Sequence, residues 1–256
     1  MLHTNKLEPD SLPNLPLQDA IEVADLRAGY GKREVLHSLT LRVAKGETYG
    51  LIGLNGAGKT TLVKTILGLK TPTSGAISIF AHSPSEADVR KNISYLPERF
   101  DPPWFLKGGE FIDFAASLYN AKVSLEDKQK YCAALSLDPR VLAHRVQTYS
   151  KGMRQKLGLI ATILTGANIL ILDEPMSGLD PQARALVKKL LMSLKSDGRT
   201  ILLSSHILSD MDEICDHVSV IHAGDCPFQG QPGELKSRTG EESLERAFLK
   251  IINVDY

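Results

Sequence analysis

The sequence predicts an α/β fold, and three observations support this class. A glycine-rich stretch, residues 53–61, stands between an expected buried strand and an expected helix. Several apolar runs end in polar residues, which is typical of buried strands in a parallel sheet. Residues 19–45 and 72–82 instead alternate apolar and polar side chains in short runs, which indicates an antiparallel sheet. We therefore expect a parallel core sheet with an antiparallel β region beside it.

The glycine-rich stretch matches G-x-x-x-x-G-K-[ST] without a gap and follows the expected strand 48–52. Its glycines let the backbone curl so that N–H groups point inward at phosphate oxygens. Lys59 brings a positive charge suited to β- and γ-phosphates, and the Thr60 hydroxyl suits Mg²⁺. A helix over 61–67 should follow the loop, with Gly68 as its stop. The expected nucleotide contacts are Gly53, Asn55, Gly56, Ala57, Gly58, Lys59, Thr60 and Thr61.

Residues of about 100–165 are expected to be helical and to interrupt the core sheet. The apolar stretch 157–172 is too short for a membrane span, so we interpret it as a helix, a turn and a strand. Aromatic and apolar residues early in the region partly follow helical spacing, and most are expected in the core; they are Phe105, Phe111, Ile112, Ala115 and Leu118. The further core strands are expected over 90–96, 168–173, 200–205 and 217–222.

A second motif, Tyr149–Gln155, precedes the strand that ends at Asp173. Ser150 is a good N-cap, and the bare N–H groups of a helix start can hold a phosphate. Taken alone, the pattern fits an ordinary capped core helix equally well. Its place just before a strand that ends in two acids favours phosphate binding. The apolar side chains at helical spacing on one face of this helix are Met153, Leu157, Ile160 and Leu164.

Polar residues at the ends of two core strands are candidates for chemistry. Asp173 ends an apolar strand, where a carboxylate can reach a metal ion from the edge of a parallel sheet. Glu174, one residue on, is the candidate general base that orients an attacking water. Pro181 opens a helix that Asp180 is suited to cap. His206 ends another buried strand, where a lone histidine is more often structural than functional.

The order of these motifs resembles that of ATP-binding cassette (ABC) ATPases over residues 19–235. The signature of that family usually reads Leu-Ser-Gly-Gly-Gln, and Tyr149–Met153 keeps only Ser150 and Gly152 of it. The resemblance implies an ABC-type P-loop ATPase with a RecA-like core sheet, an antiparallel β subdomain and an inserted helical subdomain over about 100–165. It implies ATP and Mg²⁺ as cofactors.

The resemblance also assigns roles to single residues. It places Asp173 at the metal, Asp180 in the D-loop and His206 at the γ-phosphate. Glu98 stands where the family has its Q-loop glutamine, and as a carboxylate it can still bind Mg²⁺ or water. Tyr30 stands where an aromatic ring stacks on adenine, although it also fits an ordinary turn tyrosine.

A subset of the family is indicated by three short tracts. Tyr95–Glu98 reads Tyr-Leu-Pro-Glu, a form that looks like ABC exporters of the drug, polysaccharide and cytochrome-maturation kind. The variant signature Tyr149–Met153 and the terminal tract Leu244–Leu249 point to the same subset. The resemblance therefore implies the ATP-hydrolysing subunit of a transporter, with export as its direction.

Each chain has one phosphate loop and one signature, and the resemblance implies that two chains work together, as a homodimer or as a pseudo-symmetric dimer. In the resembled family two chains face each other head to tail, and each ATP lies between the phosphate loop of one and Ser150 and Gly152 of the other. The implied partner is an integral membrane permease, which would hold the chain at the cytoplasmic face of the cell membrane. Aromatic residues in and after the loop Phe100–Trp104 are candidates to line a groove for a permease helix.

Composition agrees with a cytoplasmic protein that does not bind nucleic acid. The 256 residues are 43% apolar, which is enough for one large core. A formal net charge of zero leaves no basic footprint for nucleic acid. Three irregularly spaced cysteines suit a reducing compartment, and the cysteines and histidines of 206–226 fit no standard zinc spacing. We expect a disordered tail over 1–18 and a helical extension over 236–256.

A soluble ABC ATPase that acts in assembly, for example of iron–sulfur clusters, stays open as the alternative to transport. A repair ATPase of the superfamily would need a long coiled-coil insertion, for which the interval from Thr61 to Ser150 has no room. A module that binds but does not hydrolyse is disfavoured by the intact acids, lysine and histidine. The sequence does not identify the transported substrate, because in the resembled family the membrane partner selects it.

Overall fold

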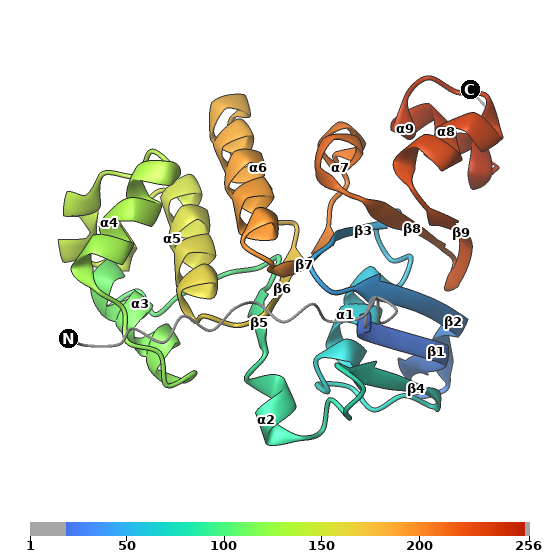
Figure 1. Cartoon of the computed structure of the whole chain (residues 1–256), viewed down its shortest axis with the longest axis horizontal. Coiled ribbons are helices and arrows are strands. Elements are labelled where there is room, and N and C mark those ends of the chain that lie inside the picture. Colours follow the sequence, from blue (N-terminus) through green and yellow to red (C-terminus); the bar gives the residue numbers. More distant parts are fainter. Residues whose placement is uncertain (1–18, 254–256) are drawn as a thin grey trace, which may run out of the picture.

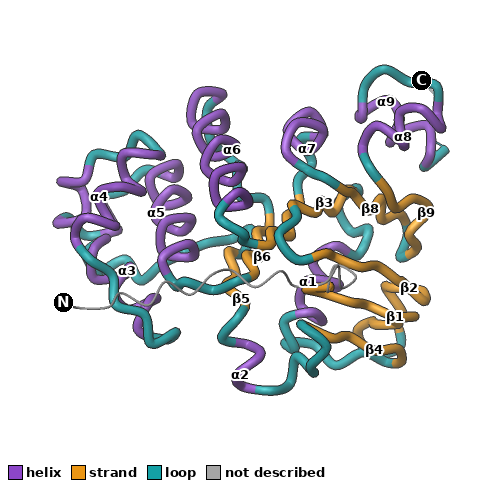
Figure 2. The backbone as a smooth tube through the Cα atoms, in the orientation of Figure 1, coloured by secondary structure: helices purple, strands orange, loops and turns teal. Residues whose placement is uncertain are grey.

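The computed structural model describes residues 19–253, so the tail expected over 1–18 lies outside the described residues. Two sheets organise this part of the chain (Figure 1). Figure 2 shows the helices within residues 108–164 gathered at one end of the molecule and the strands within residues 19–44 and 74–79 at the other. The six-stranded sheet runs between them.

The central sheet has the strand order β5-β6-β7-β3-β8-β9. Neighbouring strands are parallel except β9, which pairs antiparallel with β8. This order sets the carboxyl ends of β3, β6 and β7 side by side. The strands expected from apolar runs are present, whereas β9 was not predicted. Their bounds are β3 Thr48–Ile52, β5 Ile93–Leu96, β6 Ile169–Asp173, β7 Thr200–Ser204, β8 His217–His222 and β9 Asp225–Gly230.

A smaller antiparallel sheet, in the order β2-β1-β4, confirms the prediction from alternating residues. Its strands are β1 Asp19–Tyr30, β2 Arg33–Ala44 and β4 Ser74–Ile79. Helix α1 (Lys59–Ile66) lies between the two sheets, because Leu62, Val63 and Ile66 belong to the same buried cluster as residues of both. The phosphate-loop helix is therefore held from two sides.

Alternate residues of the central strands face two separate cores. Along β6, Ile169 and Ile171 pack toward α1, while Leu170 and Leu172 pack toward the helical region. This period of two is the pattern of a strand that is buried on both faces. The second core also takes up Leu157 and Ile160 of α5 (Lys151–Leu164).

The helical region contains α3 (Gly108–Ser117), α4 (Leu125–Ala134) and α5, with two short 3₁₀ turns between α4 and α5. The apolar residues predicted for its core divide between core and surface. Phe111 and Ile112 are buried, whereas Phe105 and Leu118 are exposed. Trp104 is 63% exposed, so a partner can reach this ring.

The remaining helices are α2 (Ala87–Arg90), α6 (Pro181–Ser196), α7 (Leu208–Ile214), α8 (Pro232–Thr239) and α9 (Leu244–Ile251). Helices α8 and α9 pack together and both contact α7. Ion pairs join α6 to α7, because Asp210 accepts from the Arg184 guanidinium at 2.7 Å and lies 3.3 Å from Lys188 Nζ. Within residues 19–253, none of the helices combines the length and apolar content that a membrane crossing requires.

Candidate functional site

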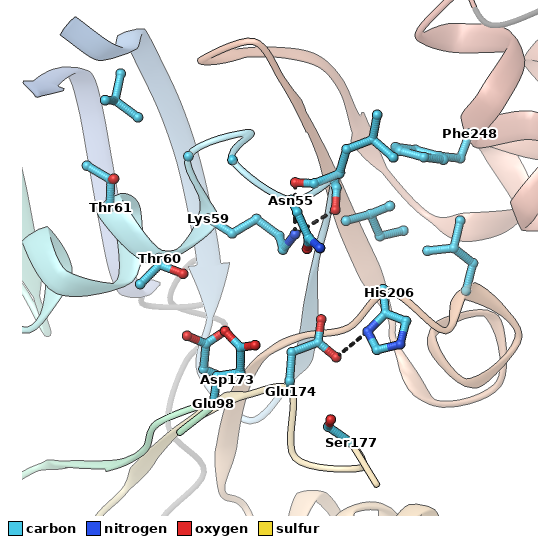
Figure 3. A pocket seen from close by; sticks show the side chains of 17 residues that line it. Asn55, Lys59, Thr60, Thr61, Glu98, Asp173, Glu174, Ser177, His206 and Phe248 are labelled. Atoms are coloured by element: carbon cyan, nitrogen blue, oxygen red, sulfur yellow. Dashed lines mark hydrogen bonds and ion pairs between the residues drawn. The ribbon is translucent and has the colours of Figure 1, made fainter. Parts of the chain in front are cut away.

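The glycine-rich loop leaves β3 and closes on the start of α1. A Cβ added at Gly53 would lie 2.4 Å from the carbonyl oxygen of Ile221, so only glycine fits there. Gly58 has a φ of +117°, a conformation that side-chain-bearing residues rarely adopt. Lys59 Nζ donates to the carbonyl oxygens of Gly53 at 2.5 Å and Leu54 at 3.3 Å (Figure 3). The loop therefore holds its lysine inward, over the space that it encloses.

Two acids meet this loop from the end of β6. Asp173 and Glu174 are both buried, at 3% and 8% exposure. Ser204, at the end of β7, donates its hydroxyl to Asp173 Oδ1. The same hydroxyl accepts from the backbone N–H of Glu174 at 3.1 Å, and the Ser204 carbonyl accepts from it at 3.2 Å. Ser204 thus fixes both acids, a role that the sequence analysis did not predict.

His206 completes this group from the loop after β7. Its Nδ1 lies 2.8 Å from Glu174 Oε2 (Figure 3). Burial raises the pKa of Glu174, and the nearby His206 works against that rise. Burial also raises the pKa of Asp173, against the hydrogen bond from Ser204. Burial lowers the pKa of Lys59, while the neighbouring acids support its charged form. The group therefore combines a cation, two acids and an imidazole in one pocket.

These side chains line a cavity of about 520 Å³. Thr60, Glu98 and Asp173 line it together, so an oxygen donor set for a hard cation faces one space. In Figure 3 the carboxylates of Glu98 and Asp173 lie beside each other below Lys59. Among residues 19–253, no three His, Cys, Asp or Glu side chains are grouped to hold a metal ion by themselves.

Most residues predicted for nucleotide contact line this cavity: Gly53, Asn55, Gly56, Gly58, Lys59, Thr60, Thr61, Glu98, Asp173, Glu174 and His206. Ala57 is buried in the loop behind them.

Besides Ala57, four predicted contacts lie outside the cavity lining: Tyr30, Ser150, Gly152 and Asp180. Tyr30 is 52% exposed, with Lys70 Nζ 4.1 Å from its ring centre. Ser150 and Asp180 cap α5 and α6, accepting from the N–H groups of Met153 at 3.2 Å and Ala183 at 2.8 Å. The capping interpretation of both residues is therefore confirmed, and neither faces the cavity of its own chain.

The start of α5 is tied to the segment that follows the acids. Gln155, which is buried, donates to the carbonyl oxygen of Pro175 at 3.0 Å. A Cβ added at Gly178 would lie 2.9 Å from Lys151 Cε, so the lysine side chain rests on that glycine. The start of α5 therefore packs on residues 175–178, and Ser150 and Gly178 are exposed beside this contact.

Sequence reasoning also missed an apolar part of the wall. Val35 of β2, Leu208 of α7 and Phe248 of α9 line the cavity beside the predicted residues. None of the three belongs to a phosphate-binding motif. Phe248 stands in the tract used above as a marker of the exporter subset, but no pattern in the sequence places it at the nucleotide.

Comparisons with known proteins agree on one family. Residues 36–177 match the family described as ABC transporter. Uncharacterised ABC transporter ATP-binding proteins of Synechocystis and Nostoc are each 35% identical and cover 80% and 82% of the chain, which spans 58% and 64% of their length. The lantibiotic transport ATP-binding protein SrtF of Streptococcus pyogenes is 32% identical, over 89% of the chain and 95% of SrtF.

The Nod factor export ATP-binding protein I of Cupriavidus metallidurans is 35% identical, over 84% of the chain and 72% of the relative. A solved structure of an ATP binding subunit of an ABC transporter superimposes with a TM-score of 0.83 at 32% identity, over 91% of the chain and 99% of that structure. The predicted fold class is thereby confirmed, and these names favour transport over the assembly alternative. The chain belongs to the ABC transporter family, as one of its ATP-binding proteins.

Proposed function

We propose that the chain hydrolyses ATP and thereby drives a membrane permease, with export as the direction. The observation that carries this proposal is the meeting of Lys59, Asp173, Glu174 and His206 around one cavity. The relatives named for lantibiotic transport and Nod factor export support the transport role and its direction. In this role the chain would sit at the cytoplasmic face of the membrane, against the permease.

Each side chain has a distinct part in this reaction. Lys59 offsets negative charge on the phosphates, and the loop N–H groups hold the phosphate oxygens. Glu174 takes a proton from the attacking water, while Ser204 holds the Glu174 backbone N–H and His206 holds its carboxylate. Thr60, Asp173 and Glu98 would hold Mg²⁺, which when bound neutralises charge between the β- and γ-phosphates.

Two of the remaining predicted contacts, Ser150 and Gly152, serve the ATP of a second copy of the chain in this proposal. Ser150 is exposed at the start of α5 and lies outside the cavity lining of its own chain. Free N–H groups at a helix start attract phosphate, and no acid stands in the first turn of α5. A head-to-tail dimer brings Ser150 and Gly152 of one chain to the ATP of the other.

The permease contact is proposed at the aromatic surface that precedes and includes α3. Trp104 and Phe105 stack edge to face at 5.8 Å, and both are more than half exposed. Phe114 and Leu118 add further exposed apolar area on the same helical region. Exposed aromatic residues of this kind are common anchors of protein interfaces.

Glu174→Gln tests the proposed hydrolysis. The amide keeps the shape of the side chain but cannot accept the proton of the water, so the ATPase rate should fall about a hundredfold or more. ATP binding should persist, and size-exclusion chromatography in Mg-ATP should show a stable dimer. Lys59→Ala is the matched comparison, because it should lose both binding and turnover. Normal turnover of Glu174→Gln would refute the assignment of the base.

A further inference from the structure

Phe248 connects the C-terminal helix to the nucleotide cavity. The residue lies in the middle of α9, yet its ring lines the same cavity as Lys59 and Glu174. It is 5% exposed, so the ring packs against protein on nearly every side. Figure 3 shows the ring reaching from α9 toward the loop that carries Asn55, on the far side of Lys59 from Asp173.

The ring shares a cavity wall and a buried cluster with the helix that follows His206. Phe248 and Leu208 line the cavity together and belong to one buried cluster with Met211 and Ile214 of α7. Leu208 is the first residue of α7, two positions after His206. Helices α7 and α9 are in direct contact. The start of α7 and the Phe248 ring therefore belong to one packed unit beside the cavity.

Helix α9 is itself firmly placed. Ser243 caps it by accepting from the Arg246 N–H at 3.2 Å, and Leu244 and Ala247 are buried on the same face as Phe248. Lys250 Nζ donates to the Thr239 carbonyl oxygen of α8 at 2.7 Å. A ring held by such a helix has little freedom to move away from Leu208.

We propose that Phe248 is a positioning residue of the nucleotide site, which holds the start of α7 and with it His206 against Glu174. The inference rests on the proposed ATPase function. His206 is exposed and bonds Glu174 through one ring nitrogen, so its placement depends on the backbone that follows it. Without the ring, the cavity wall and the buried cluster that Leu208 belongs to lose a large apolar side chain. Phe248, a residue of the last helix of the described chain, thus sets the position of His206 beside Glu174.

Phe248→Ala should lower kcat while leaving the KM for ATP within about twofold, because phosphate binding depends on the loop and Lys59. A small misplacement of His206 is expected to lower kcat by about tenfold to a hundredfold. Phe248→Leu should restore much of the rate, since it returns apolar volume to the same place. Leu249→Ala is the control, because Leu249 packs on the same core without lining the cavity.

The NMR signal of the His206 ring gives a readout that does not depend on activity. It should shift in Phe248→Ala and stay unchanged in Leu249→Ala, with His206→Gln used to assign it. Wild-type kcat and an unchanged His206 signal in Phe248→Ala would overturn the inference. Equal losses in Leu249→Ala would overturn it too, since they would show a general packing role. A wild-type chain without ATPase activity would instead refute the proposed function, and the His206 signal would still decide the role of Phe248.

Discussion

Glu174 holds a backbone φ of +52°, in the left-handed region that residues other than glycine seldom occupy. Such strain persists only where the surroundings impose it, and it gathers at functional sites. Here the imposing partner is Ser204, which accepts twice from the Glu174 N–H. The backbone conformation at Glu174 is therefore a less stable one, and in this conformation the carboxylate contacts His206.

This strain predicts a reversal of the usual order of stability between alanine and glycine. In ordinary helix or strand positions glycine is the less stable of the two by about 0.5–1 kcal/mol. At position 174 the left-handed conformation costs alanine about 1–2 kcal/mol. Glu174→Gly should therefore unfold at a higher urea concentration than Glu174→Ala, and both should lose ATPase activity. A more stable alanine variant would show that the strain is absent in solution.

Ser204 should matter for turnover although it does not line the cavity. Ser204→Ala removes the hydroxyl that bonds Asp173 and Glu174, and loss of such a supporting group typically lowers activity by about tenfold or more. Ser219→Ala is the matched control, because Ser219 is another buried serine of the same sheet, bonded to Tyr49 at 2.7 Å. Steady-state ATPase rates of the two variants, compared at equal thermal stability, decide the matter. Equal rates would remove Ser204 from the mechanism.

The residues that carry charge could be predicted from sequence, and the residue that orients them could not. Lys59, Asp173 and Glu174 stand in short motifs whose spacing alone reveals them. The role of Ser204 depends on β7 pairing with β6, which brings two residues distant in sequence into contact. Phe248 could not be predicted from the sequence for the same reason, because its helix reaches the cavity only through tertiary packing.

At the scale of single elements, α5 and α9 begin in the same way. Ser150 and Ser243 each cap a helix by accepting from the N–H three residues on, both at 3.2 Å. They differ in what they face, since Ser150 belongs to the surface proposed to meet a second chain. Comparing variants of these two serines therefore separates the effect of a lost cap on stability from its effect on function.

Ser150→Ala and Ser243→Ala should each lower the free energy of unfolding by about 1 kcal/mol, the usual cost of a lost cap. Only Ser150→Ala should also lower the ATPase rate beyond what the loss of stability explains. Urea unfolding and ATPase assays on both variants supply the comparison. If the two variants lose activity equally, Ser150 is a cap and nothing more.

The elements missed from sequence are short and carry weak patterns. Strand β9 contains Pro227 and ends at Gly230, two residues that disfavour a strand assignment. Pro227 is tolerated in β9 because this strand is the edge of the sheet. Helix α7 spans 7 residues, too few for its periodicity to stand out. By contrast α5, at 14 residues, shows several turns of apolar spacing and was predicted.

At the scale of the whole molecule, the cavity that Lys59 lines and the exposed signature residue Ser150 do not meet within one chain. In the proposed dimer each ATP then needs Lys59 from one chain and Ser150 from the other. A defect in either residue damages both sites of a uniform dimer. A mixed dimer, with one defect in each chain, keeps one site intact.

Mixing two inactive variants should therefore restore activity. Lys59→Ala and Ser150→Phe, combined in equal amounts, should form mixed dimers in half of cases, each with one intact site of two. The expected rate is about a quarter of the wild type. Lys59→Ala mixed with Glu174→Gln is the control without rescue, because both residues serve the same side of the site. Rescue in the control, or none in the test mixture, would contradict the head-to-tail arrangement.

The order of strands in the sheet is the part of the architecture that sequence did not predict. Apolar runs identified strands and their approximate bounds, since each is buried on both faces. They did not say that β3 lies between β7 and β8, because each run is apolar throughout and offers no mark of its neighbour. That order is what brings the phosphate loop, the acids and His206 to one edge.

The ion pairs between α6 and α7 have a consequence for how the rate responds to ATP concentration. Asp180 caps α6 on the exposed surface near Ser150, and α7 follows His206. Arg184 and Lys188 join the two helices through Asp210, which is 3% exposed, so salt should weaken the link little. A displacement of one helix is thus passed to the other. In a dimer, filling one nucleotide site would alter the other nucleotide site. The ATPase rate should therefore depend sigmoidally on ATP concentration, with a Hill coefficient above unity, and Arg184→Gln should bring this coefficient toward unity.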